Sequence, residues 1–102
     1  ADCWLLGGSP ILREKTIGEF TRQQPGTQRA LGWDRPTPPS SSGQYFSPAS
    51  FGHLGFTGTS LWCDPERQLA IVLLTNRVWP DSANQAIKQV RPRFHDAVVE
   101  AL

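Results

Sequence analysis

The chain has 102 residues, of which 38% are hydrophobic and four are Trp, so we expect a single packed domain spanning residues 1–102. Ten basic and nine acidic residues leave a formal charge of +1, which argues against a nucleic-acid interface because that needs a clustered basic face. No apolar run approaches the roughly 20 residues of a membrane span, and no targeting signal is present, so the sequence assigns no compartment. Cys3 and Cys63 are far apart, which favours two buried thiols over a disulfide or a metal site, and no cofactor is expected.

The N-terminal residues carry helical signals. Residues 1–6 resemble the last turns of a helix that Gly7 and Gly8 end, a beginning that suggests a truncated, processed or trimmed product. Ser9 as an N-cap, with Pro10 at the first helical position, predicts a second helix over the residues that follow.

Weaker signals follow in the middle of the chain. Residues 29–34 indicate a short strand. Residues 35–50 contain four prolines and five serines, and this composition predicts a long surface loop. Residues 51–56 predict a strand whose glycines allow close backbone approach.

The second half of the sequence predicts a β-hairpin and a helix. Residues 59–63 and the apolar run 68–75 flank a turn at residues 64–67, and the second strand is expected to be buried on both faces. Asp81 or Ser82 is expected to cap a last helix, which Pro92 should kink or split. The apolar face of that helix comprises Ile87, Val90, Phe94, Val98 and Leu102. The predicted fold class is α+β, with a small antiparallel sheet of about three strands and helices packed on one face.

Residues 51–80, FGHLGFTGTSLWCDPERQLAIVLLTNRVWP, place a His-x-Gly sequence on a strand, followed by a hairpin with an acidic-Pro turn and an apolar strand ending in Asn. This segment resembles the part of class C β-lactamases, related esterases and penicillin-binding proteins that carries their third active-site motif, Lys-Thr-Gly or His-Thr-Gly. The resemblance extends upstream through residues 31–34 and downstream to the chain end. It implies a partial β-lactamase-like fold and a serine hydrolase acting on an ester, an amide or a β-lactam.

The resemblance implies roles for individual residues. His53 matches the basic position of the motif, which in the family lies near the catalytic Tyr and sets the electrostatics around the nucleophile. Gly55 matches the motif glycine, and the backbone N–H of Phe56 matches one donor of the oxyanion hole. Leu54 stands where the family has Thr, so a hydroxyl that would contact a substrate carboxylate is missing. Asn76 and Arg77 end the apolar strand near the family's substrate carboxylate, although a strand-terminating turn explains them equally well.

The other motifs of the family are missing. No Ser in the chain has a Lys three residues later, so the Ser-x-x-Lys nucleophile is absent. Ser82-Ala83-Asn84 fits the Ser-x-Asn pattern but follows the third motif, and we interpret it as a helix N-cap. Ser60 lacks the second glycine of a nucleophile elbow and is expected to be an ordinary strand residue. His95 is expected at the surface or at its boundary.

In the parent fold, other strands pair beside the last strand of the hairpin. Without them, Leu69 to Leu74 would form an open apolar edge, so we expect a homodimer or a separate N-terminal fragment to cover it. The favoured function is a C-terminal segment of a serine hydrolase that supplies His53, Gly55 and Phe56 to a composite site and is not catalytic alone. The alternative is a non-catalytic binding or assembly module, a free-standing truncated derivative of the fold.

Overall fold

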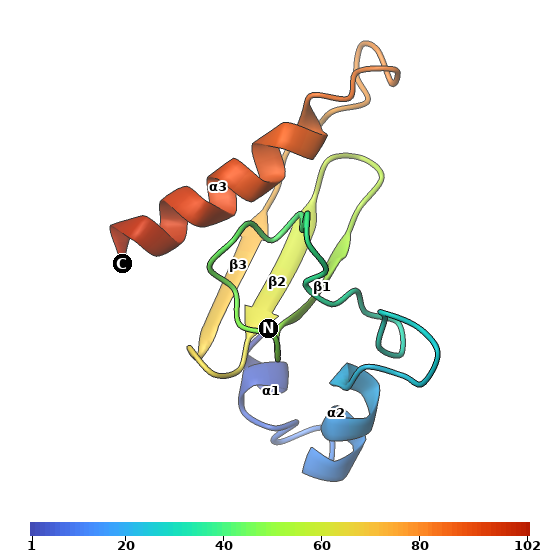
Figure 1. Ribbon diagram of the computed structural model, residues 1–102, viewed down its shortest axis with the longest axis vertical. Helices are drawn as coiled ribbons and strands as arrows, with labels where there is room; N and C mark the ends of the chain where they lie inside the picture. Colours follow the sequence, from blue (N-terminus) through green and yellow to red (C-terminus); the bar gives the residue numbers. More distant parts are fainter.

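The computed structural model describes residues 1–102 and contains a three-stranded sheet and three helices (Figure 1). In chain order the elements are α1 (Asp2–Leu5), α2 (Glu14–Thr21), β1 (Phe51–Leu54), β2 (Ser60–Asp64), β3 (Leu69–Leu73) and α3 (Ile87–Ala101). The predicted α+β class with three antiparallel strands is confirmed. None of the three helices combines the length and apolar character that crossing a bilayer requires.

The sheet is a meander of order β1-β2-β3, in which each strand pairs antiparallel with the next along the chain (Figure 1). Trp62 at the centre of β2 lies opposite Gly52 on β1 and Ile71 on β3. Gly52 is required at this position because a Cβ there would collide with the Trp62 ring and with the Leu61 carbonyl. The hairpin predicted from the apolar run and the acidic-Pro turn is therefore present at the expected place.

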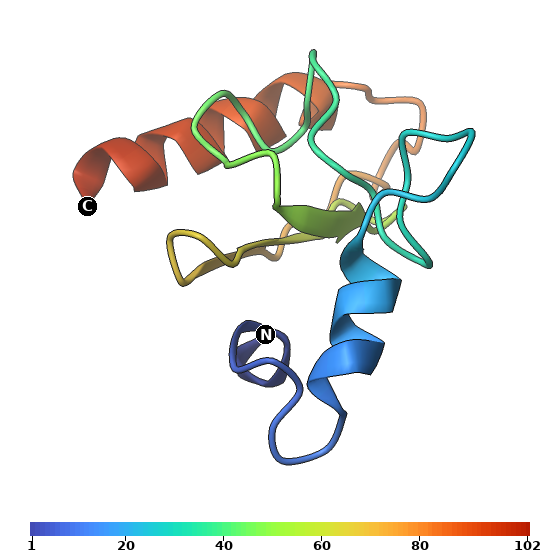
Figure 2. The same ribbon diagram turned by 60° about the horizontal axis from the view of Figure 1, so that its bottom comes forward.

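One face of the sheet carries the main core. Phe46, Trp62 and Ile71 form the buried cluster, and Phe94 and Val98 of α3 pack against it. The Pro/Ser-rich residues 35–50 contain no helix or strand, as predicted, but they cover this face of the sheet instead of projecting as a surface loop (Figure 2). Ser42 and Ser50 are completely buried within this loop.

An aromatic cluster lies on the opposite face of the sheet. Trp4 of α1 lies 5.0 Å from Trp33 and 5.8 Å from Phe51, measured between ring centroids. Phe51 pairs with Cys63, the neighbour of Trp62, so strand alternation places this cluster on the face away from α3. The helices therefore lie on both faces of the sheet, and the expectation that they pack on one face alone is wrong (Figure 2).

Strand β3 is buried on one face only. Ile71 and Leu73 face the core, whereas Val72 and Leu74 are exposed, because no helix covers the far end of the opposite face. The expectation of a strand buried on both faces is therefore wrong for these residues. β3 pairs only with β2, so its outer edge is open.

Both long helices begin later than predicted. The Ser9–Pro10 segment forms a turn in which Gly8 O accepts hydrogen bonds from Ile11 and Leu12, and α2 starts only at Glu14. Before α3, the Asp81 and Asn84 carboxylate and amide oxygens accept bonds from the backbone two residues on, so they close local turns instead of capping the helix.

The buried stripe of α3 also differs from the prediction. It comprises Ile87, Arg91 and His95 at intervals of four residues, and the helix runs through Pro92 as one element. The apolar positions Val90 and Leu102 are exposed instead. Residues 29–34 form no strand, and only Asp34 makes an isolated bridge, to Gly52.

Candidate active site

His53 is exposed on the half-covered face of the sheet. It lies on β1 opposite Leu61 of β2, and its face alternates with that of Gly52 and Trp62. A shallow hollow of about 320 Å³ borders it, and the apolar part of its wall is formed by Leu54, Leu61, Val72 and Leu74. The imidazole is therefore accessible from solvent through this hollow.

A tight turn follows β1 and carries the motif glycine. Gly58 N–H donates to Gly55 O at 3.1 Å, which closes a four-residue turn with Phe56 and Thr57 at its centre. Gly55 N–H donates to Thr59 O at 2.8 Å, and a side chain at Gly55 would collide with Thr59. The absence of a Cβ at Gly55 therefore has a local structural reason.

Phe56 is at the tip of this turn. Its side chain is 72% exposed, and its backbone N–H donates no hydrogen bond within the chain. A backbone N–H without a partner remains available to an external acceptor. Its position immediately after Gly55, next to the strand that carries His53, fits a donor aimed at a negatively charged oxygen.

Two arginines fix the turn. Arg91 of α3 is 6% exposed, and its Nη2 donates to Gly55 O and to Thr59 O, both at 2.8 Å. Arg77 donates from Nε to Phe56 O at 2.7 Å, and its guanidinium carbon lies 4.3 Å from the centre of the Phe56 ring. The turn is thus held by hydrogen bonds from two cations.

The electrostatics around the turn are positive. None of the three ion pairs in the chain includes Arg77 or Arg91. Burial, and secondarily the charge of Arg77, lowers the pKa of the Arg91 guanidinium below its usual value. Two cations without carboxylate partners create a local field that favours an anion at the turn.

The sequence also suggests substrate-binding roles for Leu54, Asn76 and Arg77, and their positions differ. Leu54 is half-buried at the end of β1 and borders hollows on both faces of the sheet, one with His53 and one with Trp62. Asn76 Oδ1 accepts from the backbone N–H groups of Val78 and Trp79 at 3.0 and 3.1 Å. This geometry supports the strand-terminating turn as the role of Asn76. Arg77, in contrast, reaches the motif turn itself.

No serine of the chain is arranged with His53 as a nucleophile with its base. Ser60 lies in β2 on the Trp62 side of the sheet, is 4% exposed, and faces away from His53. Ser82 lies in the loop before α3, where its carbonyl accepts a bond from Arg77, and the helix N-cap is Ala86. The interpretation of Ser82-Ala83-Asn84 as an N-cap is therefore wrong, because these residues lie in local turns that end before the helix starts.

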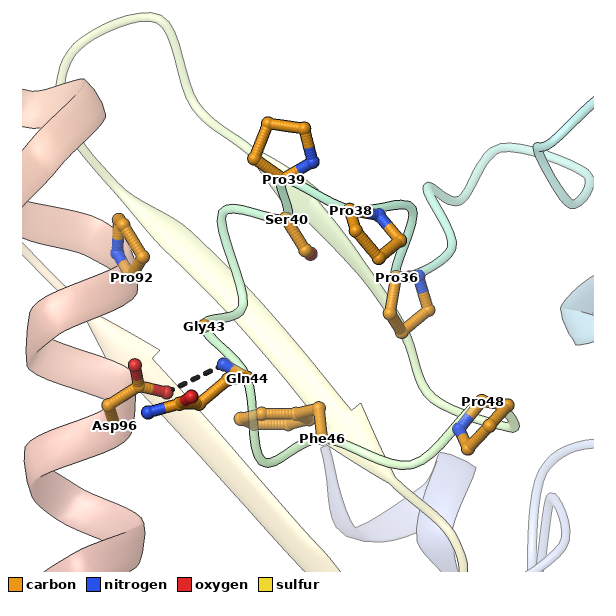
Figure 3. A pocket seen from close by; sticks show the side chains of 10 residues that line it. All are labelled: Pro36, Pro38, Pro39, Ser40, Gly43, Gln44, Phe46, Pro48, Pro92 and Asp96. Carbon is orange, nitrogen blue, oxygen red and sulfur yellow. Dashed lines mark hydrogen bonds between the residues drawn. The ribbon is translucent and has the colours of Figure 1, made fainter.

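A second cavity, of about 650 Å³, lies between the Pro/Ser-rich loop and α3 (Figure 3). Figure 3 shows proline rings and Phe46 around it, with the Gln44 N–H donating to Asp96 Oδ1 at its edge, at 2.8 Å. Phe46 packs on Trp62, so this cavity belongs to the α3 face. It is separated by the sheet from His53.

Sequence reasoning missed Arg91, and the expectation that His95 lies at the surface or its boundary is wrong, because its side chain is completely buried. Both follow Ile87 at intervals of four, the spacing of a single helix face, so helical periodicity could have placed them in the core. Counting apolar residues alone selected Val90 and Leu102, which are exposed.

Comparisons with known proteins identify the family to which this fold and its His-x-Gly strand belong. Residues 9–92 match the family described as beta-lactamase, and this match covers most of the chain. The chain therefore belongs to the β-lactamase family, which groups serine β-lactamases with penicillin-binding-protein-like enzymes.

Two relatives and one solved structure add detail to this family assignment. A putative D-alanyl-D-alanine carboxypeptidase of Salmonella paratyphi B is 34% identical over 85 residues, which are 79% of this chain and 20% of that protein. The corresponding protein of Salmonella gallinarum is 36% identical over 87 residues, with the same shares. A crystal structure of a β-lactamase from Mycobacterium bovis superposes with a TM-score of 0.75 at 27% identity, over 97% of this chain and 40% of that one. The chain thus spans about a fifth of the length of its carboxypeptidase relatives.

Proposed function

We propose that this chain acts as a C-terminal segment of a serine hydrolase. It contributes His53 and the Phe56 N–H to a composite site whose nucleophile lies outside these 102 residues. The proposal is supported by membership of the β-lactamase family and by the small share of the relatives' length that the chain spans. Acting alone, the chain is expected to turn over no substrate, because it contains no Ser-x-x-Lys sequence.

The unpaired Phe56 N–H is the observation that carries the proposal. Acyl transfer passes through a tetrahedral intermediate with a negatively charged oxygen, and preorganised N–H donors stabilise that charge. Phe56 offers such a donor on a turn fixed by Arg77 and Arg91, and no group of the chain competes for it. His53 lies on β1, two residues before Gly55, with its side chain exposed.

The substrate class is an ester, an amide or a β-lactam. The names of the Salmonella relatives favour a peptide ending in D-alanine, while the apolar Leu54 removes a hydroxyl that could contact a substrate carboxylate. The uncompensated charges of Arg77 and Arg91 favour a substrate or intermediate that carries negative charge close to the turn.

Intact-mass analysis tests the absence of a nucleophile. We expect the chain alone to show no added mass after incubation with a fluorophosphonate or, separately, with a penicillin. A stoichiometric serine adduct on the folded chain would contradict the proposal, and peptide mapping at Ser60 would then locate it.

A chimaera tests the composite site. In it, the part of this chain that matches the Salmonella paratyphi B relative, 79% of its length, replaces the corresponding segment of that relative, which supplies the rest of the fold. We expect a serine adduct within the relative's portion and hydrolysis of an activated ester, both reduced by His53→Ala. A folded chimaera that forms no adduct, although the unaltered relative does, would reject the composite site.

The second candidate function is a non-catalytic binding or assembly module. The observation that favours it is the open edge of β3, beside which Val72 and Leu74 are exposed. Such an edge pairs with another strand, either from a second copy or from a separate N-terminal fragment. A stable homodimer of the chain, with no adduct in the chimaera, would favour this function over the first.

A further inference from the structure

Arg91 is a buried cation without an acidic partner. It is 6% exposed, it takes part in no ion pair, and its Nε has no hydrogen-bond partner. Burying a guanidinium in this way is costly, and an uncharged residue of similar volume would pack on the helix face without that cost. The presence of a buried arginine here, bonded to two backbone carbonyls, therefore needs an explanation beyond packing.

The contacts of Arg91 concern one particular peptide group. Its Nη2 donates at 2.8 Å to Gly55 O, and the same peptide plane carries the Phe56 N–H. Because the peptide bond is a resonance-coupled unit, drawing electron density towards the carbonyl oxygen makes the N–H a stronger donor. The hydrogen bond is charge-assisted, which increases this polarisation.

Arg91 also fixes where this peptide points. Gly55 O accepts from Gly58 N–H as well as from Arg91, and Arg91 donates to Thr59 O on the other arm of the turn. The carbonyl therefore has donors on two sides and cannot rotate without losing both bonds. The N–H on the opposite side of the same plane is oriented by the same constraint.

On the basis of the proposed function, we infer that Arg91 is a positioning residue for the oxyanion-hole donor, acting on the Phe56 N–H through the Gly55 carbonyl. It orients and polarises that N–H from α3 without touching the substrate. A lysine replaces this geometry only in part, because its ammonium lacks the two coplanar N–H bonds with which Nη2 reaches both carbonyls.

Nuclear magnetic resonance of the 102-residue chain tests this directly, and needs no catalytic activity. We expect Arg91→Gln to move the Phe56 amide nitrogen and the Gly55 carbonyl carbon upfield, because both are deshielded by a bond to that carbonyl. Arg91→Lys should give a smaller shift in the same direction. Arg93→Gln, on the exposed side of the same helix, should leave both signals unchanged.

Circular dichroism establishes which variants are folded. If Arg91→Gln fails to fold, the folded Arg91→Lys chain decides the matter. Unchanged Phe56 and Gly55 signals in any folded Arg91 variant overturn the inference.

Kinetics of the chimaera separate this inference from the proposed function. We expect Arg91→Lys to lower kcat about tenfold with KM unchanged, since a donor to the oxyanion acts in the transition state. Arg93→Gln should match the parent. Turnover with an unaltered kcat in Arg91→Lys overturns the role of Arg91 and leaves the composite site standing. A parent chimaera without turnover contradicts the composite site, while the resonance shifts still decide the role of Arg91.

Discussion

At the scale of single residues, His95 shows how a histidine can be held neutral in a core. Its side chain is completely buried, its Nδ1 donates to Ser41 O at 2.9 Å, and its Nε2 has no partner. Burial is the main cause that lowers the pKa of His95, and the charge of Arg91 adds to it, whereas hydrogen bonding to the backbone and the charge of Asp96 oppose it. The residue ties α3 to the Pro/Ser-rich loop in its uncharged form.

This burial predicts a pH dependence of stability. Because the pKa of His95 is lower in the folded state, the unfolded chain binds more protons below about pH 6.5, and stability falls as the pH decreases through that value. The urea midpoint should therefore drop between about pH 7.5 and 5.5. His95→Phe should flatten this dependence, whereas His53→Gln, which alters the exposed histidine, should leave it intact. A parent midpoint that is constant over this range would contradict the prediction.

At the scale of elements, the β2–β3 turn is organised by one buried carboxylate. Asp64 Oδ1 accepts from the N–H groups of Glu66 and Arg67, and both carboxylate oxygens accept from Ser47, which joins the Pro/Ser-rich loop to the hairpin. Burial on its own raises the pKa of Asp64, but the hydrogen bonds from Ser47, Arg67 and Glu66 outweigh it and lower the pKa below its usual value.

Removing the charge of Asp64 should loosen both segments. Asp64→Asn replaces an accepting oxygen with an NH2 group that faces donors, and we expect a loss of about 3 kcal/mol in the free energy of unfolding, measured by urea denaturation. Glu66→Gln, in the same turn but exposed and without side-chain bonds, should change stability by less than about 0.5 kcal/mol. Equal effects of the two substitutions would refute the role assigned to Asp64.

The elements also show what the sequence could predict. The hairpin was found because the apolar run and the Asp64–Pro65 turn agree on one local structure. The starts of α2 and α3 were missed because polar side chains such as Asp81 and Asn84 close turns and cap helices with the same chemistry. A motif predicts His53, Gly55 and Phe56 as site residues, whereas Arg91 reaches that motif from 36 residues away and leaves no local pattern.

At the scale of the whole molecule, the sheet has one finished face and one unfinished face. The Pro/Ser-rich loop and α3 cover the first, while the second is covered by α1 near Phe51 and is bare around Val72 (Figure 2). The outer edge of β3 is also open, because β3 pairs only with β2. We propose that a further strand pairs with the open edge of β3 and that additional apolar residues cover the bare face. Both would come from another copy of the chain or from another segment.

Self-association of the chain tests this proposal. We expect sedimentation velocity to show a dimer whose population rises with protein concentration, and Val72→Lys to shift it to a monomer, because a charge on the bare face opposes burial. Val90→Lys alters a comparably exposed valine on α3 and should leave the association unchanged. A chain that stays monomeric at all concentrations would exclude the homodimer and leave a separate fragment as the partner.

The order of the strands also has a kinetic consequence. Because β1, β2 and β3 pair only with their neighbours along the chain, the sheet closes through short loops whose entropy cost is small. The bonds from Arg91 to the Gly55 and Thr59 carbonyls join α3 to this meander, but they span 36 and 32 residues, as against the short hairpin connections. We therefore expect the hairpins to form early in folding, with the cationic support of the Phe56 turn assembled last.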